Sequence, residues 1–563
     1  MTERGIKCLV VSDFNSANFV SLLNNDASSP CLEAASGPYG QVAQVLADGG
    51  SDCWRNPHDA VIVWTQPGSV IGGFRRLQEG EPVDLQALLQ EVDVFAGLVE
   101  QAAGRTKSLF VMTWAVPAYS RAFGLLEMRT GIGAANTLAR MNLRLIEDLE
   151  RVRGIHFLDS AKWLATVGAG GFSDKLWYMA KVPFANEVFT EAVKDLKSAL
   201  NALQGRARKL IVLDLDDTLW GGIVGDLGWE NLALGGHDPA GEAFVDFQRA
   251  LKSLARRGIL LAIVSKNEEK LALEAIRKHP EMILREKDFA GWRINWNDKA
   301  QNLVDLVSEL GLGLQSAVFI DDNPAERARI RGALPEVLVP EWPQDKTGYT
   351  RALLGLDCFN SALVTEEDLQ RTALYRSERQ RSELRRNIGS VDNWLRSLEQ
   401  VVTVAPLAPA NLPRAAQLLN KTNQMNLSTR RMTDVEAMTW SEAPNRRFMV
   451  LSVFDRFGDS GLTGLLGMEE AGDRLEVVDF VLSCRVMGRR VEEAMVHLAV
   501  EHARKRGCRI VSLRYKATER NKPCLEFLKR SGLREAPEGV FTWDAGRDYA
   551  MPEAVRVVDA AAS

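Results

Sequence analysis

Three short apolar runs in the middle of the chain each end in a polar side chain. The polar residues and the runs before them are Asp214 after 210–213, Ser265 after 260–264 and Asp321 after 317–320. Runs this short and continuously apolar are typical of strands buried on both faces of a parallel sheet. Because the sites of open α/β sheets lie at the carboxyl ends of their strands, the pattern predicts one sheet edge that carries these polar groups.

The N-terminal part alternates strand-like and helix-like stretches. The strand-like runs cover 8–11, 60–64 and 109–114, and the amphipathic stretches cover 92–101 and 134–151. Such alternation predicts a three-layer α/β domain over residues 1–185. Apolar residues then recur at helical spacing between Phe189 and Leu203, so residues 186–205 are expected to be a helical linker or packing helix.

The middle runs define a second α/β domain over residues 206–345. Residues 221–236 hold six glycines and little helical pattern, which favours a hairpin flap over a large inserted cap. A small cap leaves a site open, which suits a large substrate. Four tryptophans could wall a pocket here, although aromatic core packing explains them equally well: Trp220, Trp229, Trp292 and Trp296.

The last third of the chain predicts a mixed α+β domain over residues 401–550. It follows a charged helical connector at 346–400 and precedes a tail at 551–563. Its expected strands are 448–454, 461–468, 475–482 and 510–515, and its expected helices are about 491–505 and 521–529. Successive strands without intervening helices indicate antiparallel pairing in its first half.

Composition narrows the choice of function. The chain has 563 residues, 46% hydrophobic and 25% charged, which is ordinary for a globular protein of several domains. A net charge of −5 with both signs interspersed argues against a nucleic-acid partner. Seven scattered cysteines without CxxC spacing favour a reducing compartment, and no apolar run reaches the length of a membrane span. We therefore expect a cytoplasmic protein that contacts no membrane.

The chemistry of the middle domain begins with an acid pair. Asp214 and Asp216 flank Leu215, so both carboxylates can face one site while the leucine packs away. Such a pair can hold a divalent cation, and one carboxylate can attack phosphorus. A solvated turn after a core strand is the simpler alternative, and only the later motifs argue against it.

Acid pair, hydroxyl, lysine and second acid pair, in that order, resemble the four motifs of the haloacid-dehalogenase (HAD) phosphotransferase superfamily. The resemblance spans about residues 206–345 and implies a Rossmannoid fold with Mg²⁺ as its cofactor. The roles that it implies are Asp214 as nucleophile, Asp216 as general acid/base, Ser265 and Lys299 on the phosphoryl oxygens, and a metal site drawn from Asp214, Asp216, Asp321 and Asp322. Phosphoryl transfer needs this combination of nucleophile, cation and oxygen donors.

The N-terminal domain is similar to SGNH/GDSL hydrolase domains. Ser12 stands where that family has its nucleophile, and residues 37–40 would be the oxyanion loop. The sequence departs from the family because Trp177 occupies the position of the catalytic base, and neither His58 nor His156 replaces it. A serine without a base is a poor nucleophile, so a scaffold or docking role is expected for this domain.

The C-terminal domain resembles the GNAT acyltransferase fold. Its turn into a helix matches that family's phosphate-binding loop at Arg485 and Gly488, with Arg490 in place of the last small residue. These residues and Asn521 are the candidates for binding phosphopantetheine or coenzyme A through backbone N–H groups at a helix N-terminus. A plain α/β turn is the alternative.

Together the three parts are similar to the long FkbH-like proteins of polyketide and mixed peptide assembly lines. The matching stretches are 214–225, 293–299, 320–324 and 483–493. The resemblance implies a glyceryl transferase and phosphatase. Such an enzyme takes 1,3-bisphosphoglycerate, removes phosphate and leaves a glyceryl thioester on an acyl carrier protein.

The route of the glyceryl group is open. The carrier's phosphopantetheine thiol could take it directly, or Cys484 beside the phosphate-type loop could relay it, with Cys524 a weaker candidate. The alternatives are a Mg²⁺-dependent phosphatase of a small metabolite with non-catalytic flanking domains, a non-catalytic docking protein, and an acetyltransferase. The sequence does not reveal the natural product, the cognate carrier, the oligomeric state or the role of the first domain.

Overall fold

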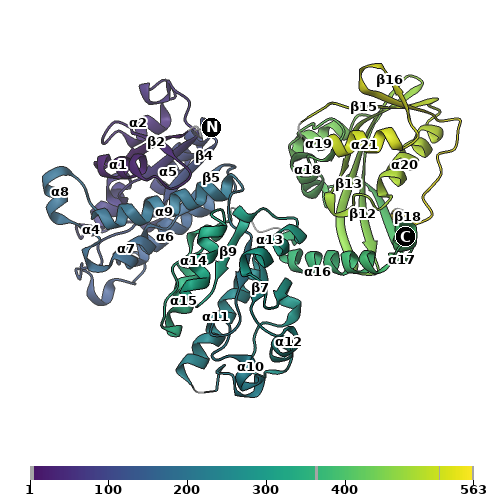
Figure 1. Cartoon of the computed structure of the whole chain (residues 1–563). Coiled ribbons are helices and arrows are strands. Elements are labelled where there is room, and N and C mark those ends of the chain that lie inside the picture. Colours follow the sequence, from purple (N-terminus) through teal and green to yellow (C-terminus); the bar gives the residue numbers. More distant parts are fainter. Residues whose placement is uncertain (1–4, 237, 362–365, 519, 561–563) are drawn as a thin grey trace. The chain divides into compact units, whose positions relative to one another are not determined.

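The computed structural model describes residues 5–236, 238–361, 366–518 and 520–560 (Figure 1). Its contacts divide the chain into two compact units. One unit holds the first 208 residues and a returning segment that begins at Gly355, and the other holds the remainder from Lys209 onward. None of the described helices combines the length and apolar character that a membrane-spanning helix needs.

The first unit is a parallel sheet covered by helices on both faces. The strand order is β2-β1-β3-β4-β5. The strands are β1 (Ile6–Ser12), β2 (Leu32–Ser36), β3 (Ala60–Trp64), β4 (Ser108–Met112) and β5 (Ile155–Leu158). The helices are α1 (Ala17–Asn25), α2 (Val42–Ala47), α3 (Pro67–Val70), α4 (Gly72–Gln78), α5 (Leu85–Ala103), α6 (Ala134–Leu149), α7 (Ser160–Val167), α8 (Asp174–Ala180) and α9 (Asn186–Leu203).

Alternating side chains explain the three layers of this unit. Val61 and Val63 of β3 pack against α2, α4, α5 and α6, whereas Ile62 and Trp64 pack against α1, α7 and α9. The three-layer prediction is confirmed, as are the helices expected at 92–101 and 134–151. The helix expected after residue 185 is α9, and its apolar face, centred on Phe189, lies in the core of this unit.

The second unit begins with a four-stranded parallel sheet in the order β8-β7-β6-β9. The strands are β6 (Leu210–Leu213), β7 (Leu260–Ser265), β8 (Phe289–Ile294) and β9 (Ala317–Ile320). The helices are α10 (Val224–Leu227), α11 (Pro239–Arg256), α12 (Glu269–Lys278), α13 (Lys299–Glu309), α14 (Pro324–Ala333) and α15 (Tyr349–Leu354). The three apolar runs are therefore neighbouring strands, and α13 and α14 cover one face of their sheet.

The stretch expected to form a flap is small. A single antiparallel bridge between Gly221 and Ala233 closes it, and its described residues contain one helical turn, α10, and the short 3-10 turn Trp229–Asn231. It therefore leaves the carboxyl edge of the sheet without a large cover. Trp220 lies in the core, whereas Trp296 is three-quarters exposed.

The C-terminal part is one mixed sheet in the order β16-β17-β15-β14-β13-β12-β10-β18, and β11 pairs with β14. The strands are β10 (Gln400–Pro406), β11 (Met425–Asn426), β12 (Arg446–Asp455), β13 (Gly458–Ala471), β14 (Arg474–Leu482), β15 (Ile510–Arg514), β16 (Arg534–Ala536), β17 (Val540–Asp544) and β18 (Val555–Asp559). The helices are α16 (Glu366–Asn387), α17 (Val391–Ser397), α18 (Leu412–Lys421), α19 (Asp434–Ser441), α20 (Val491–Lys505) and α21 (Lys522–Arg530).

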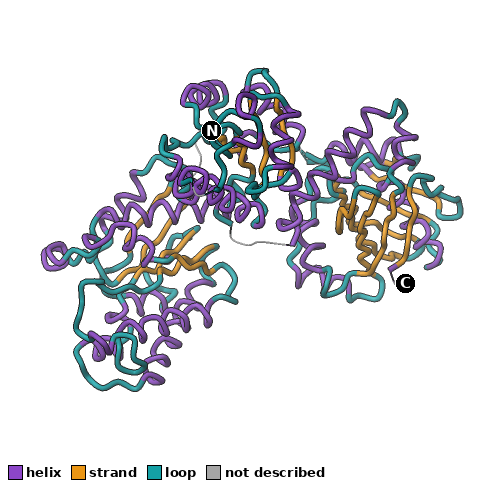
Figure 2. Tube along the Cα trace, turned by 90° about the horizontal axis from the view of Figure 1, so that it is seen from below, coloured by secondary structure: helices purple, strands orange, loops and turns teal. Residues whose placement is uncertain are grey.

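The expected succession of strands, helix, strand and helix is confirmed in this part as β12-β13-β14, α20, β15 and α21. Figure 2 shows the strands gathered with helices beside them. Strand β14 pairs with β15 only over Arg474–Val477 and then diverges from it. Strand β18 lies within the stretch expected to be a tail, 551–563, and it pairs with β10.

Candidate active site

The four motifs of the middle domain meet at the carboxyl edge of its sheet. Asp214 follows β6, Ser265 ends β7, Lys299 begins α13 and Asp321 follows β9. All four are buried. The Lys299 ammonium lies 3.1 Å from Asp214 Oδ1 and 2.6 Å from Asp321 Oδ2. Parallel strands bring these residues together because their carboxyl ends share one edge.

Three carboxylates at this edge are arranged as ligands of a hard cation. Oxygen atoms of Asp214, Asp321 and Asp322 lie within 4.8 Å of one another. Burial, followed by the charge of Asp214, raises the pKa of Asp321 to about 6, and burial also raises the pKa of Asp322. Ionised carboxylates this close and this buried need positive charge, and Lys299 supplies only one. The donor set therefore fits a divalent cation such as Mg²⁺.

The side chain of Asp216 is held apart from that group. Its Oδ1 accepts hydrogen bonds from Trp220 Nε1 at 2.9 Å and from the Val224 N–H at 3.1 Å, and its Oδ2 accepts from Asn267 Nδ2 at 2.8 Å. Burial raises its pKa. A carboxyl group fixed beside the site and biased toward its protonated form suits proton transfer. As a metal-binding carboxylate, Asp216 stays a prediction that this geometry does not favour.

Ser265 lies on the strand next to Asp214 and is almost fully buried. Its backbone carbonyl accepts a hydrogen bond from the Asn295 N–H at 3.1 Å. Because Ser265 ends β7, it lies at the same carboxyl edge of the sheet as the other motifs. Its role with phosphoryl oxygens remains a prediction.

Two residues of the site lie outside the four motifs. Lys346 Nζ donates to the Asp217 carbonyl at 2.8 Å and lies 3.7 Å from Asp322 Oδ2. Tyr349 OH donates to the same carbonyl at 3.1 Å. Asp217 has a left-handed backbone, φ 53°, so its turn benefits from outside support. No spacing rule connects Lys346 with a motif so far back in the sequence, and only the fold reveals the contact.

The N-terminal domain has a serine pocket without a histidine. Ser12 Oγ accepts a hydrogen bond from the Phe14 N–H at 3.1 Å, and it lines a pocket of about 290 Å³ with Gly37 and Tyr39. The expected nucleophile and oxyanion loop are therefore adjacent. His156, however, lies on β5, and β3 and β4 separate that strand from β1. Among the described residues, no histidine therefore stands beside Ser12 as a catalytic base.

The predicted phosphate loop of the C-terminal domain is occupied by the chain's own carboxylate. Glu492, which is almost fully buried in the first turn of α20, accepts a hydrogen bond from the Gly488 N–H at 2.6 Å. Arg490 adopts a left-handed backbone and lies 3.5 Å from Asp392. Arg485 lies in the 3-10 turn Cys484–Val486. An incoming phosphate would have to displace Glu492 to reach the Gly488 N–H.

Asn521 is likewise engaged internally. Its Nδ2 donates to the carbonyls of Asn426 at 3.0 Å and Lys516 at 2.8 Å, and its side chain is inaccessible to solvent. The segment it holds fills the gap between β14 and β15: β11 pairs with the end of β14, and the Lys516 N–H donates to the Leu427 carbonyl at 3.0 Å. A pantetheine chain would need this segment to move. Cofactor binding at Asn521 is thus unsupported by the geometry.

The two candidate thiols differ in accessibility. Cys484 is exposed at the end of β14. Cys524 is buried on α21, and burial raises the pKa of its thiol to about 12. Only Cys484 is placed to meet a partner.

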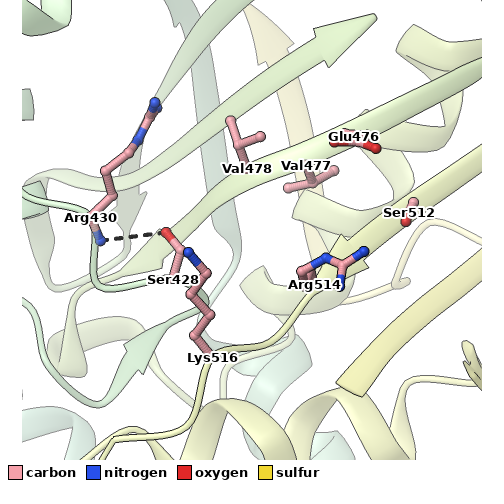
Figure 3. A pocket seen from close by; sticks show the side chains of 8 residues that line it. All are labelled: Ser428, Arg430, Glu476, Val477, Val478, Ser512, Arg514 and Lys516. Carbon is pink, nitrogen blue, oxygen red and sulfur yellow. Dashed lines mark hydrogen bonds between the residues drawn. The ribbon is translucent and has the colours of Figure 1, made fainter. Parts of the chain in front are cut away.

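A further pocket of about 340 Å³ lies beside the filled gap. In Figure 3, Arg514 and Lys516 reach it from β15 and the loop after it, and Ser428 and Arg430 from the loop after β11. Arg430 pairs with the buried carboxylate of Asp479, and Arg514 with Glu538 at 3.2 Å. These pairs balance most of the positive charge of the pocket.

Of three comparisons with known proteins, the one with solved structures supports the fold expected for the middle domain. No protein-family model and no curated protein matches the sequence. Among solved structures, the N-terminal part of BF1531 from Bacteroides fragilis, which contains a phosphatase domain and was crystallised with Mg, is 26% identical with a TM-score of 0.59. The match covers 64% of this chain and 95% of that one.

Acetyltransferase structures match a smaller part of the chain. Nourseothricin acetyltransferase is 18% identical over 26% of this chain and 98% of its own, with a TM-score of 0.18. The ribosomal-protein-S18-alanine N-acetyltransferase of Escherichia coli is 10% identical over 26% of this chain and 94% of its own, with a TM-score of 0.21. Over most of its length, the chain is thus similar in fold to a structure that contains a phosphatase domain.

Proposed function

We propose that the middle domain is a Mg²⁺-dependent phosphatase of the HAD type. The observation that carries this proposal is the bridge of Lys299 between Asp214 and Asp321, with the Asp322 carboxylate beside them. The likeness to a phosphatase-containing structure crystallised with Mg supports it. Asp214, Asp321 and Asp322 would hold the ion, which when bound offsets the charge between the Asp214 carboxylate and a phosphoryl group.

The chain's own residues then divide the reaction. The Asp214 carboxylate attacks phosphorus, the bond to the leaving oxygen breaks, and that oxygen takes the proton of Asp216. Water next attacks the aspartyl phosphate, giving its proton back to Asp216, and phosphate leaves with the Asp214 carboxylate restored. Lys299 stabilises the phosphoryl oxygens, and the contacts of Asp216 with Trp220 and Asn267 keep its carboxyl group in place.

As the finer proposal, the substrate is 1,3-bisphosphoglycerate and the product a glyceryl thioester on an acyl carrier protein. The motif resemblance to FkbH-like proteins and the exposure of Cys484 support it. The carrier thiol, or Cys484 before it, would displace the phosphate of the acyl phosphate, while the Asp214 site removes the second phosphate.

The alternative, a phosphatase of a small metabolite with non-catalytic flanks, also has an observation in its favour. Glu492 already occupies the Gly488 N–H, and the β11 segment fills the gap near Asn521. Both positions where a coenzyme or phosphopantetheine was expected are therefore closed by the chain itself.

Phosphate release tests the first proposal. Asp214→Asn keeps the size of the side chain but removes the nucleophile, so we expect phosphate release with Mg²⁺ to fall by at least about 10³-fold. Asp246→Asn, which alters an exposed ion pair on α11, is the matched control and should leave the rate unchanged. Equal rates for wild type and Asp214→Asn would reject Asp214 as nucleophile.

The intact mass of a holo carrier protein tests the finer proposal. After incubation with the protein, Mg²⁺ and freshly generated 1,3-bisphosphoglycerate, the wild type should leave a glyceryl adduct. Asp214→Asn should leave a phosphoglyceryl adduct or none. Phosphate release without any adduct on two unrelated carriers would favour the small-metabolite phosphatase.

A further inference from the structure

Exposed apolar side chains recur on three segments of the N-terminal unit that follow the carboxyl ends of its strands. We define the docking rim as Tyr39, Tyr119, Leu125, Met128, Tyr178 and Met179, each more than half exposed. They come from the loop after β2, the long loop between β4 and α6, and α8. A continuous exposed apolar surface on a globular unit usually marks a binding site.

Hydrogen bonds hold these segments together at one edge. Tyr119 OH donates to Asp174 Oδ1 at 3.1 Å, which joins the long loop to α8. The Asn15 N–H donates to the Lys181 carbonyl at 2.9 Å, which joins the end of α8 to the loop after β1. Tyr39 and Lys181 both line the pocket that contains Ser12. The segments of the docking rim are therefore joined to this pocket, through Tyr39 and Lys181 directly and through the contact of Tyr119 with α8.

The charges interspersed with the docking rim are mainly positive. Arg121, Arg129, Lys175 and Lys181 are exposed, and in the described part of the chain none of them forms an ion pair with a carboxylate. Lys181 instead lies over the Trp177 ring at 4.9 Å. The nearby acid Asp174 is engaged by Tyr119. This surface is thus basic on a chain whose net charge is −5.

We propose that the docking rim binds an acidic amphipathic helix of a partner protein. The exposed apolar residues would take the apolar face of the helix, and the unpaired cations its carboxylates. Tyrosine, methionine and arginine are the residue types enriched in protein interfaces, and methionine adapts its shape to a partner. That this partner is the carrier protein rests on the proposed function.

The pocket beside the docking rim suits the polar arm that a carrier protein carries. It is about 290 Å³ and carries the hydroxyl groups of Ser12, Ser16 and Ser36 together with Asn15. Hydroxyl and amide groups can hydrogen-bond to a polar arm such as phosphopantetheine without any covalent step. Such binding would be a function for a pocket whose serine has no histidine beside it.

Charge reversal on the docking rim tests the proposal in the full chain. The probes are a fluorescently labelled holo acyl carrier protein and an acidic amphipathic peptide with Asp and Glu on one face and Leu and Met on the other. Arg121→Glu with Arg129→Glu should weaken binding of both probes at least about tenfold at low salt and reduce the salt dependence. Leu125→Ser should weaken both without changing the salt dependence.

Matched controls lie on the same unit. Arg151→Glu with Arg153→Glu reverses two exposed charges just before β5, at the opposite edge of the sheet, and Leu143→Ser removes an exposed leucine from α6. Both should bind the probes as the wild type does. Phosphate release at Asp214 should be unchanged in all these variants, and Asp214→Asn should still bind the carrier, so a failure of the phosphatase proposal is recognised separately.

Four results would overturn the proposal. The first is that neither probe binds the wild type. The second is that the rim variants bind the probes as well as the control variants do. Vesicles of anionic lipid bind the wild type and lose binding on charge reversal while the protein probes do not, which would make the docking rim a membrane surface. Sedimentation shows that reversal dissociates a homo-oligomer, which would make a second copy its occupant.

Discussion

Lys346 supports the turn of Asp217 from outside the motifs. The ammonium and the Tyr349 hydroxyl both donate to one carbonyl, and Lys346 also lies near Asp322. Burial lowers the pKa of Lys346, but Tyr349 and the acids Asp322 and Asp217 outweigh burial and leave the pKa raised. Lys346 is therefore charged at neutral pH.

We expect Lys346→Met to lower kcat for phosphate release by about 10- to 100-fold and to weaken Mg²⁺ binding, because the turn and its neighbouring carboxylate lose their support. Tyr349→Phe, which keeps the ring and loses one hydrogen bond, should have a smaller effect. Steady-state kinetics over a Mg²⁺ titration separates kcat from metal affinity. Unchanged kinetics in Lys346→Met would restrict Lys346 to a structural role.

Asp13 is a half-buried acid that the proposed chemistry does not use. Its two oxygens accept the Gln66 N–H at 3.1 and 2.9 Å, and burial raises its pKa to about 6. The folded state then binds more protons than the unfolded state between pH 4 and 6, so ionisation opposes folding. The stability of the first unit should decline as the pH rises through this window and stay low above it.

Asp13→Asn keeps the acceptor and removes the charge. We expect it to stabilise the first unit above pH 7 by up to about 3 kcal/mol, and the gain should vanish near pH 4. Hydrogen exchange of β1 peptides, compared between wild type and variant at each pH, measures this locally. A gain independent of pH would show that the charge of Asp13 is not its cause.

At the scale of elements, α16 is attached to the C-terminal sheet by buried charges. Arg381 Nε donates to Asp455 Oδ2 at 2.6 Å, and Arg489 Nη1 lies 3.3 Å from the same oxygen. Arg381, Asp455 and Arg489 are almost fully buried. The connector expected from the sequence is therefore packed against the sheet in its second half. Glu378, which is half-buried on α16, pairs with both arginines as well, so the loss of Asp455 leaves two buried guanidinium groups sharing that one carboxylate.

We expect Asp455→Ala to destabilise the C-terminal part by about 3 kcal/mol, because two buried guanidinium groups lose their buried partner and keep only Glu378. Asp473→Ala at an exposed turn is the control. Limited proteolysis should cut the variant within α16 while the control resists. Equal resistance of variant and control would show that the network contributes little.

At the scale of the whole molecule, metal binding should stabilise one part selectively. A ligand of the native state alone adds about 2.7 kcal/mol at a concentration 100 times its Kd. Mg²⁺ should therefore protect the strands β6 and β9 from hydrogen exchange and leave β1 and β13 unchanged. Asp321→Asn should abolish the protection, and EDTA should reverse it. Equal protection of all three sheets would indicate non-specific binding of the ion.

The periodicity of apolar residues predicted three strands in each of the first two sheets, whereas β2 and β5 of the first sheet and β8 of the second were not predicted. Continuous apolar runs such as 210–213 are strands because both faces of a parallel sheet are buried, and the acids after them reach one edge for the same reason. The short strand β2 escaped prediction because most of its residues are exposed and its pattern is weak. Strand β18 escaped because its partner, β10, is remote in sequence.

What the sequence determined by itself was local: the strands, the helices, and the acids, hydroxyl and lysine at their ends. Only the tertiary structure decided which of these groups are available. In the structure, Lys346 donates to the carbonyl of Asp217, and the Asp216 carboxylate binds the Val224 N–H apart from the three carboxylates suited to Mg²⁺. The Gly488 N–H of the expected phosphate loop donates to Glu492. Such contacts depend on distances between remote segments, which periodicity and spacing do not encode.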